Sequence, residues 1–154
     1  MEGIGFKGIT SALILNSSLI LKCNDEGLYN ATIYYRENGE KLGQIEVVDE
    51  SLTNCVLKAE RILNKSKLAK NTQEFLQSLT GIDWLLKKKF AISVSKNNET
   101  YYGIRVSADD YLCNNGLFHS NSSNGVCDLL ESCNDWADTL RNHIEPMKEL
   151  EKEL

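Results

Sequence analysis

The sequence predicts an α+β fold in which helices pack on one face of an antiparallel sheet of about five strands. Two observations indicate this class. A β-hairpin pattern occurs at 33–47 and again at 92–106, and a helix-like segment follows each copy. Aligned without gaps, the copies share Ile, Asn, Glu, Ile and Val. The pattern suggests a single domain, 1–154, made of two pseudo-repeated hairpin-plus-helix halves at about 9–80 and 82–145.

The first hairpin follows apolar, strand-favouring stretches within 9–23 and turns near Asn38-Gly39. A two-residue turn there would place Ile33 opposite Gln44 and send Ile45 to the other face. A three-residue loop, such as a type I turn followed by a left-handed Gly39, avoids this conflict. It places one set of alternate residues on a single apolar face: Ala31, Ile33, Tyr35, Ile45 and Val47.

The second hairpin leads to the same conclusion. A loop with an odd number of residues unites the apolar positions of its two strands, which are Phe90, Ile92, Val94, Tyr102, Ile104 and Val106. Asn98 occupies the place of Gly39, and asparagine tolerates the left-handed conformation better than most residues.

Helices are expected after the first hairpin. Asp49 or Ser51 can cap a helix that runs to about Lys65, with apolar residues at helical spacing. A shorter helix is predicted over 71–79, where Gly81 supplies a stop. The stretch 82–89 fits either a helical turn or an early start to the next strand.

The connection at 108–124 is longer than most loops, which suggests a functional loop, a mobile loop or a short unseen strand. A long helix is predicted from Gly125. An apolar stripe follows spacings of four and three along it, from Val126 to Met147. Pro146 should kink or end the helix near Ile144 and leave 146–154 as a helical tail or frayed end. The stripe predicts packing on the sheet, with a homodimer seam as the alternative.

The charge of the chain is acidic but unevenly distributed. The net charge is −5 and the isoelectric point about 5.1, which argues against a generic nucleic-acid binder. Residues 51–105 nevertheless carry ten basic and four acidic side chains, while both flanks are negative.

The cysteines indicate a reducing compartment. There are five, at irregular spacing, and an odd number does not form a complete disulfide framework. The sequence shows neither a signal peptide nor an apolar run of membrane length. We therefore expect a cytoplasmic protein that does not enter a membrane.

Motifs for cofactors or catalysis lack their usual context. Gly3, Gly5 and Gly8 match the dinucleotide-binding fingerprint, but no strand precedes them and the next residues favour strand instead of helix. Four residues could supply a zinc site, but they lack the paired spacing of structural sites: Cys113, His119, Cys127 and Cys133. We expect no metal and no cofactor.

A nucleophilic site has equally little support. Cys113 could pair with His119 or His143, oriented by Asp109 or Asp110, but no catalytic motif surrounds them. The sequence therefore leans away from an enzyme.

The outer face of the predicted sheet presents residues that are common in binding surfaces. Tyr34 and Arg36 project from the first hairpin, Tyr101 and Arg105 from the second, and Lys87-Lys88-Lys89 lies just upstream. Exposed tyrosine and arginine serve both single-stranded nucleic-acid binding and protein interfaces.

The predicted tandem of sheet-plus-helix units over Leu28–Arg141 resembles the topology of the Pur-alpha and Whirly families. That resemblance implies single-stranded nucleic-acid binding. The helices within 51–80 and the acidic balance depart from those families.

These observations favour a non-enzymatic protein-binding module, a small acidic inhibitor or adaptor of the kind that immunity proteins and phage anti-defence proteins exemplify. Its candidate contact is the acidic side of the C-terminal helix, with Asp128, Glu131, Asp135 and Asp138. The alternative is single-stranded nucleic-acid binding through Lys87, Lys88, Lys89, Tyr101 and Arg105. A third hypothesis is a small-ligand-binding oligomer built on the C-terminal helix.

Overall fold

The computed structural model describes the main chain of most of the protein. The described segments are 6–13, 17–37, 41–65, 70–96, 100–108, 118–122 and 125–153. Side chains are described within these segments except at 36, 37, 41, 42, 108, 119 and 144–153.

The fold is α+β, with one antiparallel sheet of six strands in the order β3-β2-β1-β4-β5-β6. The strands are β1 (Ser18–Cys23), β2 (Tyr29–Glu37), β3 (Lys41–Asp49), β4 (Phe90–Lys96), β5 (Tyr102–Ala108) and β6 (Phe118–Ser122). The helices are α1 (Lys7–Ala12), α2 (Leu52–Asn64), α3 (Lys70–Gln77), α4 (Thr80–Lys87) and α5 (Val126–Glu153).

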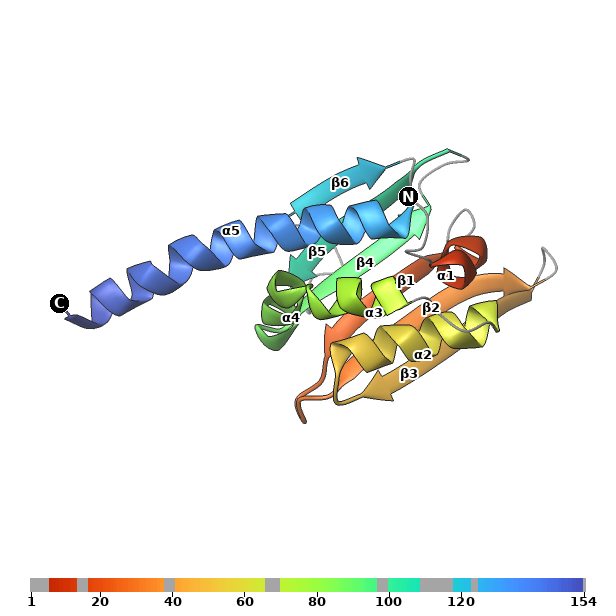
Figure 1. The fold of residues 1–154 in the computed structure, drawn as a ribbon, viewed down its shortest axis with the longest axis horizontal. Helices are drawn as coiled ribbons and strands as arrows, with labels where there is room; N and C mark the ends of the chain where they lie inside the picture. The colour runs from red at the N-terminus through yellow and green to blue at the C-terminus, as the bar shows by residue number, and fades with distance from the viewer. Residues whose placement is uncertain are drawn as a thin grey trace.

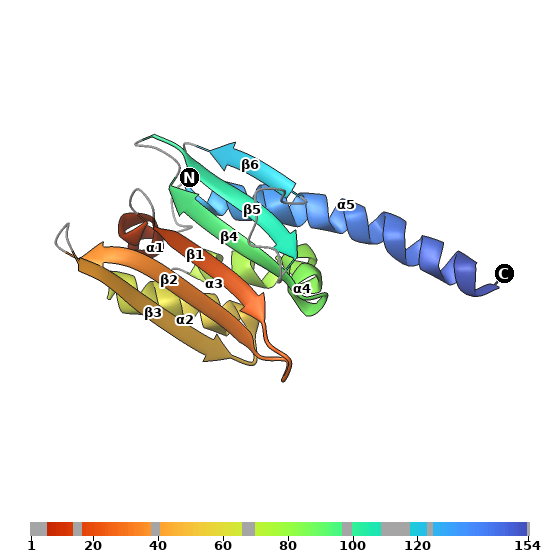
Figure 2. The ribbon, with the colours of Figure 1, turned by 180° about the vertical axis from the view of Figure 1, so that it is seen from behind.

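The helices all lie on one face of the sheet (Figure 1), and the opposite face is left open (Figure 2). Burial alternates along the strands accordingly: in β1, Leu19, Leu21 and Cys23 are buried under the helices, while Ser18 and Ile20 are partly exposed on the open face. The α+β class and the placement of helices on one face, both predicted from sequence, are thus confirmed.

The register of the first hairpin confirms the predicted loop length. Ile33 pairs with Ile45 and Glu37 with Lys41, which leaves three residues, 38–40, between the strands. The conformation of these residues, including Gly39, lies outside the described residues.

The second hairpin has the predicted parity but a longer loop. Ile92 pairs with Val106 and Lys96 with Tyr102, so five residues, 97–101, separate the strands. Its register is therefore shifted by two residues from that of the first hairpin. Asn98, the expected counterpart of Gly39, lies outside the described residues.

The two hairpins also occupy different places in the sheet. The first is β2–β3, at one side of the sheet, and α2 follows it directly. The second is β4–β5, and β6 intervenes before α5. The sequence alignment of the hairpins therefore does not match equivalent strands. The order helix–strand–strand–strand–helix occurs twice along the chain, as α1 to α2 and again as α4 to α5.

Several predicted elements need correction. Residues 7–12 form α1 where strand was expected, because Phe6, Ile9 and Leu13 are buried together at helical spacing. The ambiguous stretch 82–89 is mostly helical, as part of α4, and Gly81 lies inside this helix and does not stop the preceding one, which ends at Gln77. The long connection contains a short strand, β6, which brings the number of strands to six.

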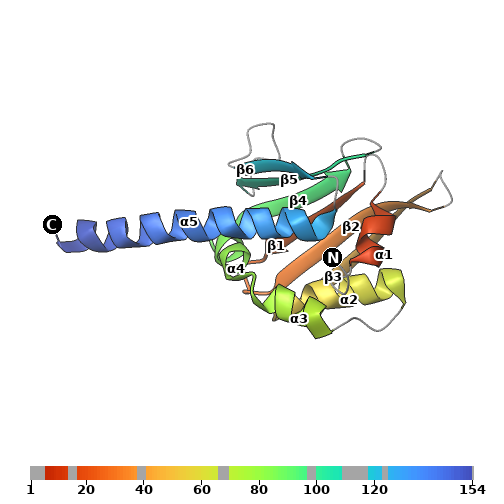
Figure 3. The same ribbon diagram turned by 45° about the horizontal axis from the view of Figure 1, so that its top comes forward.

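The predictions for the helices after each half have mixed outcomes. Ser51 caps α2 by accepting a hydrogen bond from the Asn54 amide, as predicted. Of the outcomes predicted for Pro146, an end of the helix near Ile144 is wrong, because α5 continues through Pro146 to Glu153 as the alternative of a helical tail implied. Proline removes one amide donor and its ring crowds the carbonyl four residues earlier, but this part of α5 extends beyond the sheet (Figure 3), where water can satisfy the carbonyl left over.

A side chain from α2 holds the start of α1. Phe6, the N-cap residue of α1, provides no capping side chain. Instead, the buried carboxylate of Glu60 accepts the amides of Gly8, at 2.7 Å, and Ile9, at 2.9 Å. Burial raises the pKa of the Glu60 carboxyl, and these two amide hydrogen bonds oppose the rise.

The second half contains the same arrangement. Leu79, the N-cap of α4, provides no capping side chain either. The side-chain oxygen of Asn134, on α5, accepts the amide of Ile82 at 3.0 Å. Fifty-two positions separate the donor and acceptor residues in this pair, as they do for Gly8 and Glu60.

Glycine makes both contacts possible. A Cβ atom on Gly8 would lie 2.6 Å from the Asn64 amide nitrogen, and one on Gly81 would lie 2.6 Å from the Asn134 carbonyl oxygen. In each half, the first helix therefore approaches the last helix backbone to backbone.

We predict that Gly8→Ala and Gly81→Ala each lower the free energy of unfolding by about 1–3 kcal/mol, because the added methyl group overlaps backbone that cannot move freely. This loss opposes the gain of up to about 1 kcal/mol that alanine normally brings to a helix. Chemical denaturation measures the effect, with the exposed Gln73→Ala as the control, expected within about 0.5 kcal/mol of wild type. Stabilisation by either glycine substitution would show that the close approach is absent.

The raised pKa of Glu60 predicts the direction in which stability changes with pH. Because its pKa is raised in the folded state, folding favours the protonated carboxyl, and the stability from this group is lost as pH rises above its ordinary pKa of 4.5. Glu60→Gln removes this dependence. The stability of wild type relative to Glu60→Gln should therefore fall between pH 4 and the raised pKa, as read from urea denaturation across that range. If the stability of wild type relative to Glu60→Gln instead rose with pH, the two amide hydrogen bonds, and not burial, would determine the direction of the Glu60 pKa shift.

Candidate functional site

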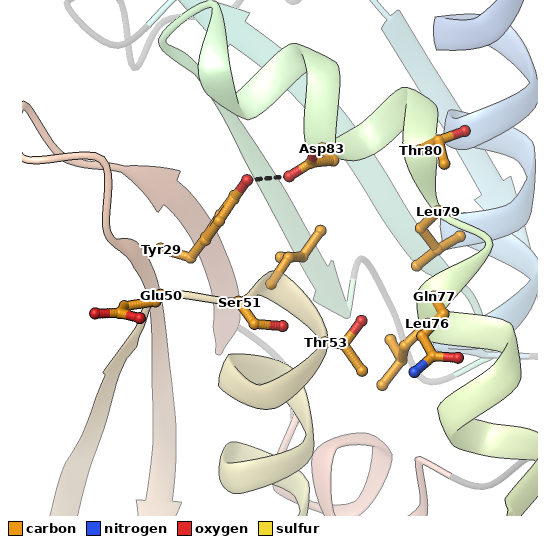
Figure 4. Close-up of a pocket in the computed structure, with 10 residues that line it drawn as sticks. Tyr29, Glu50, Ser51, Thr53, Leu76, Gln77, Leu79, Thr80 and Asp83 are labelled. Atoms are coloured by element: carbon orange, nitrogen blue, oxygen red, sulfur yellow. Dashed lines mark hydrogen bonds between the residues drawn. The ribbon is translucent and has the colours of Figure 1, made fainter.

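A pocket of about 260 Å3 opens between the start of α2, the end of α3 and the start of α4. Its apolar wall consists of Leu52, Leu76 and Leu79, and polar groups surround it (Figure 4). The remaining lining residues are Tyr29, Glu50, Ser51, Thr53, Gln77, Thr80 and Asp83. The pocket therefore combines apolar surface with the Asp83 carboxylate and several hydroxyl groups, while the Glu50 carboxylate points away from it.

Two side chains, Tyr29 and Lys87, contact the Asp83 carboxylate at this pocket. The Tyr29 hydroxyl, which points at it in Figure 4, donates a hydrogen bond to one carboxylate oxygen. Lys87, one turn along α4, lies 3.2 Å from the other oxygen. Burial, followed by this hydrogen bond to Asp83, raises the pKa of Tyr29, so the phenol stays protonated and acts as a donor.

The exposed side of α5 carries a second candidate site. Asp128, Glu131 and Asp135 follow spacings of three and four and are exposed on one helical face, which we call the acidic stripe. Asp128 also accepts a hydrogen bond from the Ser122 hydroxyl of β6. Asp138 departs from the predicted set, because it is half-buried and its carboxylate pairs with Arg141 at 3.0 Å.

The lysine run has structural contacts. Lys87 pairs with Asp83, and the Lys89 ammonium donates to the backbone carbonyl of Asn24 at 2.5 Å. Lys88 is exposed at the end of α4. Tyr101 is also exposed, but it lies beyond the far end of β4, roughly 20 Å from the lysines along that strand. The structure therefore does not bring these predicted nucleic-acid contacts together.

The open face of the sheet carries the other predicted residues. Tyr34 on β2 and Arg105 on β5 both project from it, as expected, but two strands lie between them, a separation of roughly 14 Å. The side chain of Arg36 is outside the described residues. Between Tyr34 and Arg105 the face is mostly small and polar, with Ser18, Ser93 and Ser95.

The cysteine and histidine candidates are dispersed or undescribed. Cys113, Asp109, Asp110 and the side chain of His119 lie outside the described residues. Cys133 is buried on α5 and Cys127 is half-buried, and burial raises the pKa of both thiols to about 12. His143 is exposed on the same helix. Within the described segments, no three His, Cys, Asp or Glu side chains gather as metal ligands would.

Comparisons with known proteins give no family. The chain matches no protein-family model, and neither a curated protein nor a solved structure shows significant similarity to it. In the part of the chain that the structure describes, no helix is both long and apolar enough to cross a membrane.

Sequence reasoning missed the pocket, because its residues come from four separate elements. Tyr29 and Asp83 are 54 positions apart, and no local pattern links them. One signal was available: an isolated acidic residue, Asp83, within the otherwise apolar run from Ile82 to Leu86.

We predict that Tyr29→Phe lowers the free energy of unfolding by about 1 kcal/mol, because it removes only the hydrogen bond to Asp83. Tyr34→Phe is the matched control on the open face and should change stability by less than about 0.5 kcal/mol. Thermal or urea denaturation compares the two variants. Equal effects would show that the contact between Tyr29 and Asp83 contributes nothing to folding.

Proposed function

We propose that the protein is a non-enzymatic, protein-binding module, a small acidic inhibitor or adaptor that contacts a basic surface of its partner through α5. One observation carries the proposal. The residues of α5 include eight acidic and three basic side chains, a net charge of −5, which equals the net charge of the whole chain. The rest of the protein is balanced, with fourteen side chains of each sign.

The exposure of the acidic stripe supports this surface as the contact. Glu131 and Asp135 form no ion pair with any described side chain, so their charges are available to a partner. A concentrated negative field on one helix steers a basic partner during encounter and excludes acidic proteins. Asp138 contributes less, since Arg141 already neutralises it.

Binding of this kind would inhibit the partner or link it to another protein, without a catalysed reaction. A partner whose basic residues surround an active site or a nucleic-acid groove would lose access to its own ligand when α5 covers them. We place this activity in the cytoplasm, because Cys23, Cys55, Cys127 and Cys133 are all free thiols.

A homodimer through α5 is the second candidate. The C-terminal part of the helix extends well past α4 and the sheet (Figure 3), which leaves it accessible to a second chain. Sedimentation measures this directly, and a monomer at high protein concentration would rule out this candidate.

The acidic stripe gives the functional prediction. The double variant Glu131→Lys/Asp135→Lys should abolish co-purification of the basic partner from the native host at modest salt, because it replaces attraction with repulsion. Glu26→Lys/Glu74→Lys makes the same change in net charge at exposed positions away from α5 and should retain the partner. Wild-type binding should weaken as salt rises. Retention of the partner by the α5 variant would disprove the proposal.

A further inference from the structure

The pocket beside Asp83 has the chemistry of a site for one basic side chain. Its apolar wall is narrow, since Leu52, Leu76 and Leu79 belong to the core and are only 7%, 2% and 4% exposed. Asp83 is the acidic residue beside the apolar wall, whereas the Glu50 carboxylate points away from that wall in Figure 4, and the lining contains no lysine, arginine or histidine. A ligand with an apolar stem and a cationic end matches both features.

The size of the pocket further limits the kind of ligand that can bind. Sites for cofactors and drug-sized ligands occupy roughly 300–1,000 Å3, and this pocket, at about 260 Å3, is smaller. It accommodates one long side chain better than a nucleotide. Both α2 and α4 begin at the pocket, and their N-termini disfavour positive charge. A cation must therefore bind directly at the Asp83 carboxylate, which offsets this effect.

We propose that this pocket binds the side chain of an arginine or lysine residue from a partner protein. The stem packs against the leucine wall and the charged end reaches Asp83. A carboxylate accepts about four hydrogen bonds, so Asp83 can keep its contact with Tyr29 while it binds the incoming donor. The site lies apart from the acidic stripe of α5, and the proposal does not rest on the function proposed for that stripe.

Lys87 is the competitor that the incoming cation displaces. Its ion pair with Asp83 joins residues one turn apart, and the Lys87 side chain is 64% exposed, so the pair is weak. Removing the Lys87 ammonium therefore strengthens binding of an external cation. This gain of affinity distinguishes a specific site from general attraction to an acidic protein.

The experiment titrates the isotope-labelled protein with acetyl-Gly-Arg-Gly-amide and follows backbone amide shifts by NMR. The control peptide carries citrulline, which has nearly the same shape without the charge. We expect the arginine peptide to shift amides within 50–53 and 76–83, and to bind about tenfold more tightly than the citrulline peptide. Equal affinity of the two peptides, or shifts concentrated on α5, would overturn the proposal.

Three variants sharpen the test. Asp83→Asn, which keeps an acceptor for Tyr29, should weaken arginine binding about tenfold. Lys87→Met should strengthen it about two- to fivefold. Lys70→Met makes the same change in net charge at an exposed position seven residues before Gln77, and should leave the affinity within about twofold of wild type. If Lys87→Met and Lys70→Met bind alike, Asp83 is not the cation's partner and the proposal fails.

Discussion

The fold depends on a polar contact that recurs in each half, in which the last helix caps the first. Glu60 of α2 binds the amides that begin α1, and Asn134 of α5 binds the amide of Ile82 in α4. Short helices have costly nuclei and unpaired amides at their starts, so six-residue α1 needs such support. Gly8 and Gly81 allow the backbones to approach, and the buried Ile9 and Ile82 then anchor both helices over the sheet.

This contact also explains what the sequence could and could not predict. The hairpins were predictable because side-chain parity is local, and Ile33 does pair with Ile45. The five-residue loop of the second hairpin was not, because parity cannot distinguish loops of three and five residues. Helix α1 was missed because its cap, Glu60, lies 52 positions away. The recurrence of this contact was hidden for the same reason, because it involves single glycines and caps and not a continuous motif.

The two candidate sites also differ in how far the sequence could predict them. The acidic stripe was predictable, since Asp128, Glu131 and Asp135 follow helical spacing along one exposed face. The pocket could not be predicted, because its apolar wall and Asp83 come from separate elements. Both sites attract positive charge, one through the net charge of α5 and the other through Asp83 set against apolar surface. A partner rich in lysine or arginine is consistent with both.

Hydrogen exchange tests the central structural claim most directly. If the last helix caps the first in each half, the amides of Gly8, Ile9 and Ile82 exchange slowly, at rates close to those of the central amides of β1 and β4. The amide of Lys7, the first of α1, makes no hydrogen bond to a described residue and serves as the internal reference, expected to exchange much faster. Exchange of Gly8 and Ile9 at the rate of Lys7 would contradict the account.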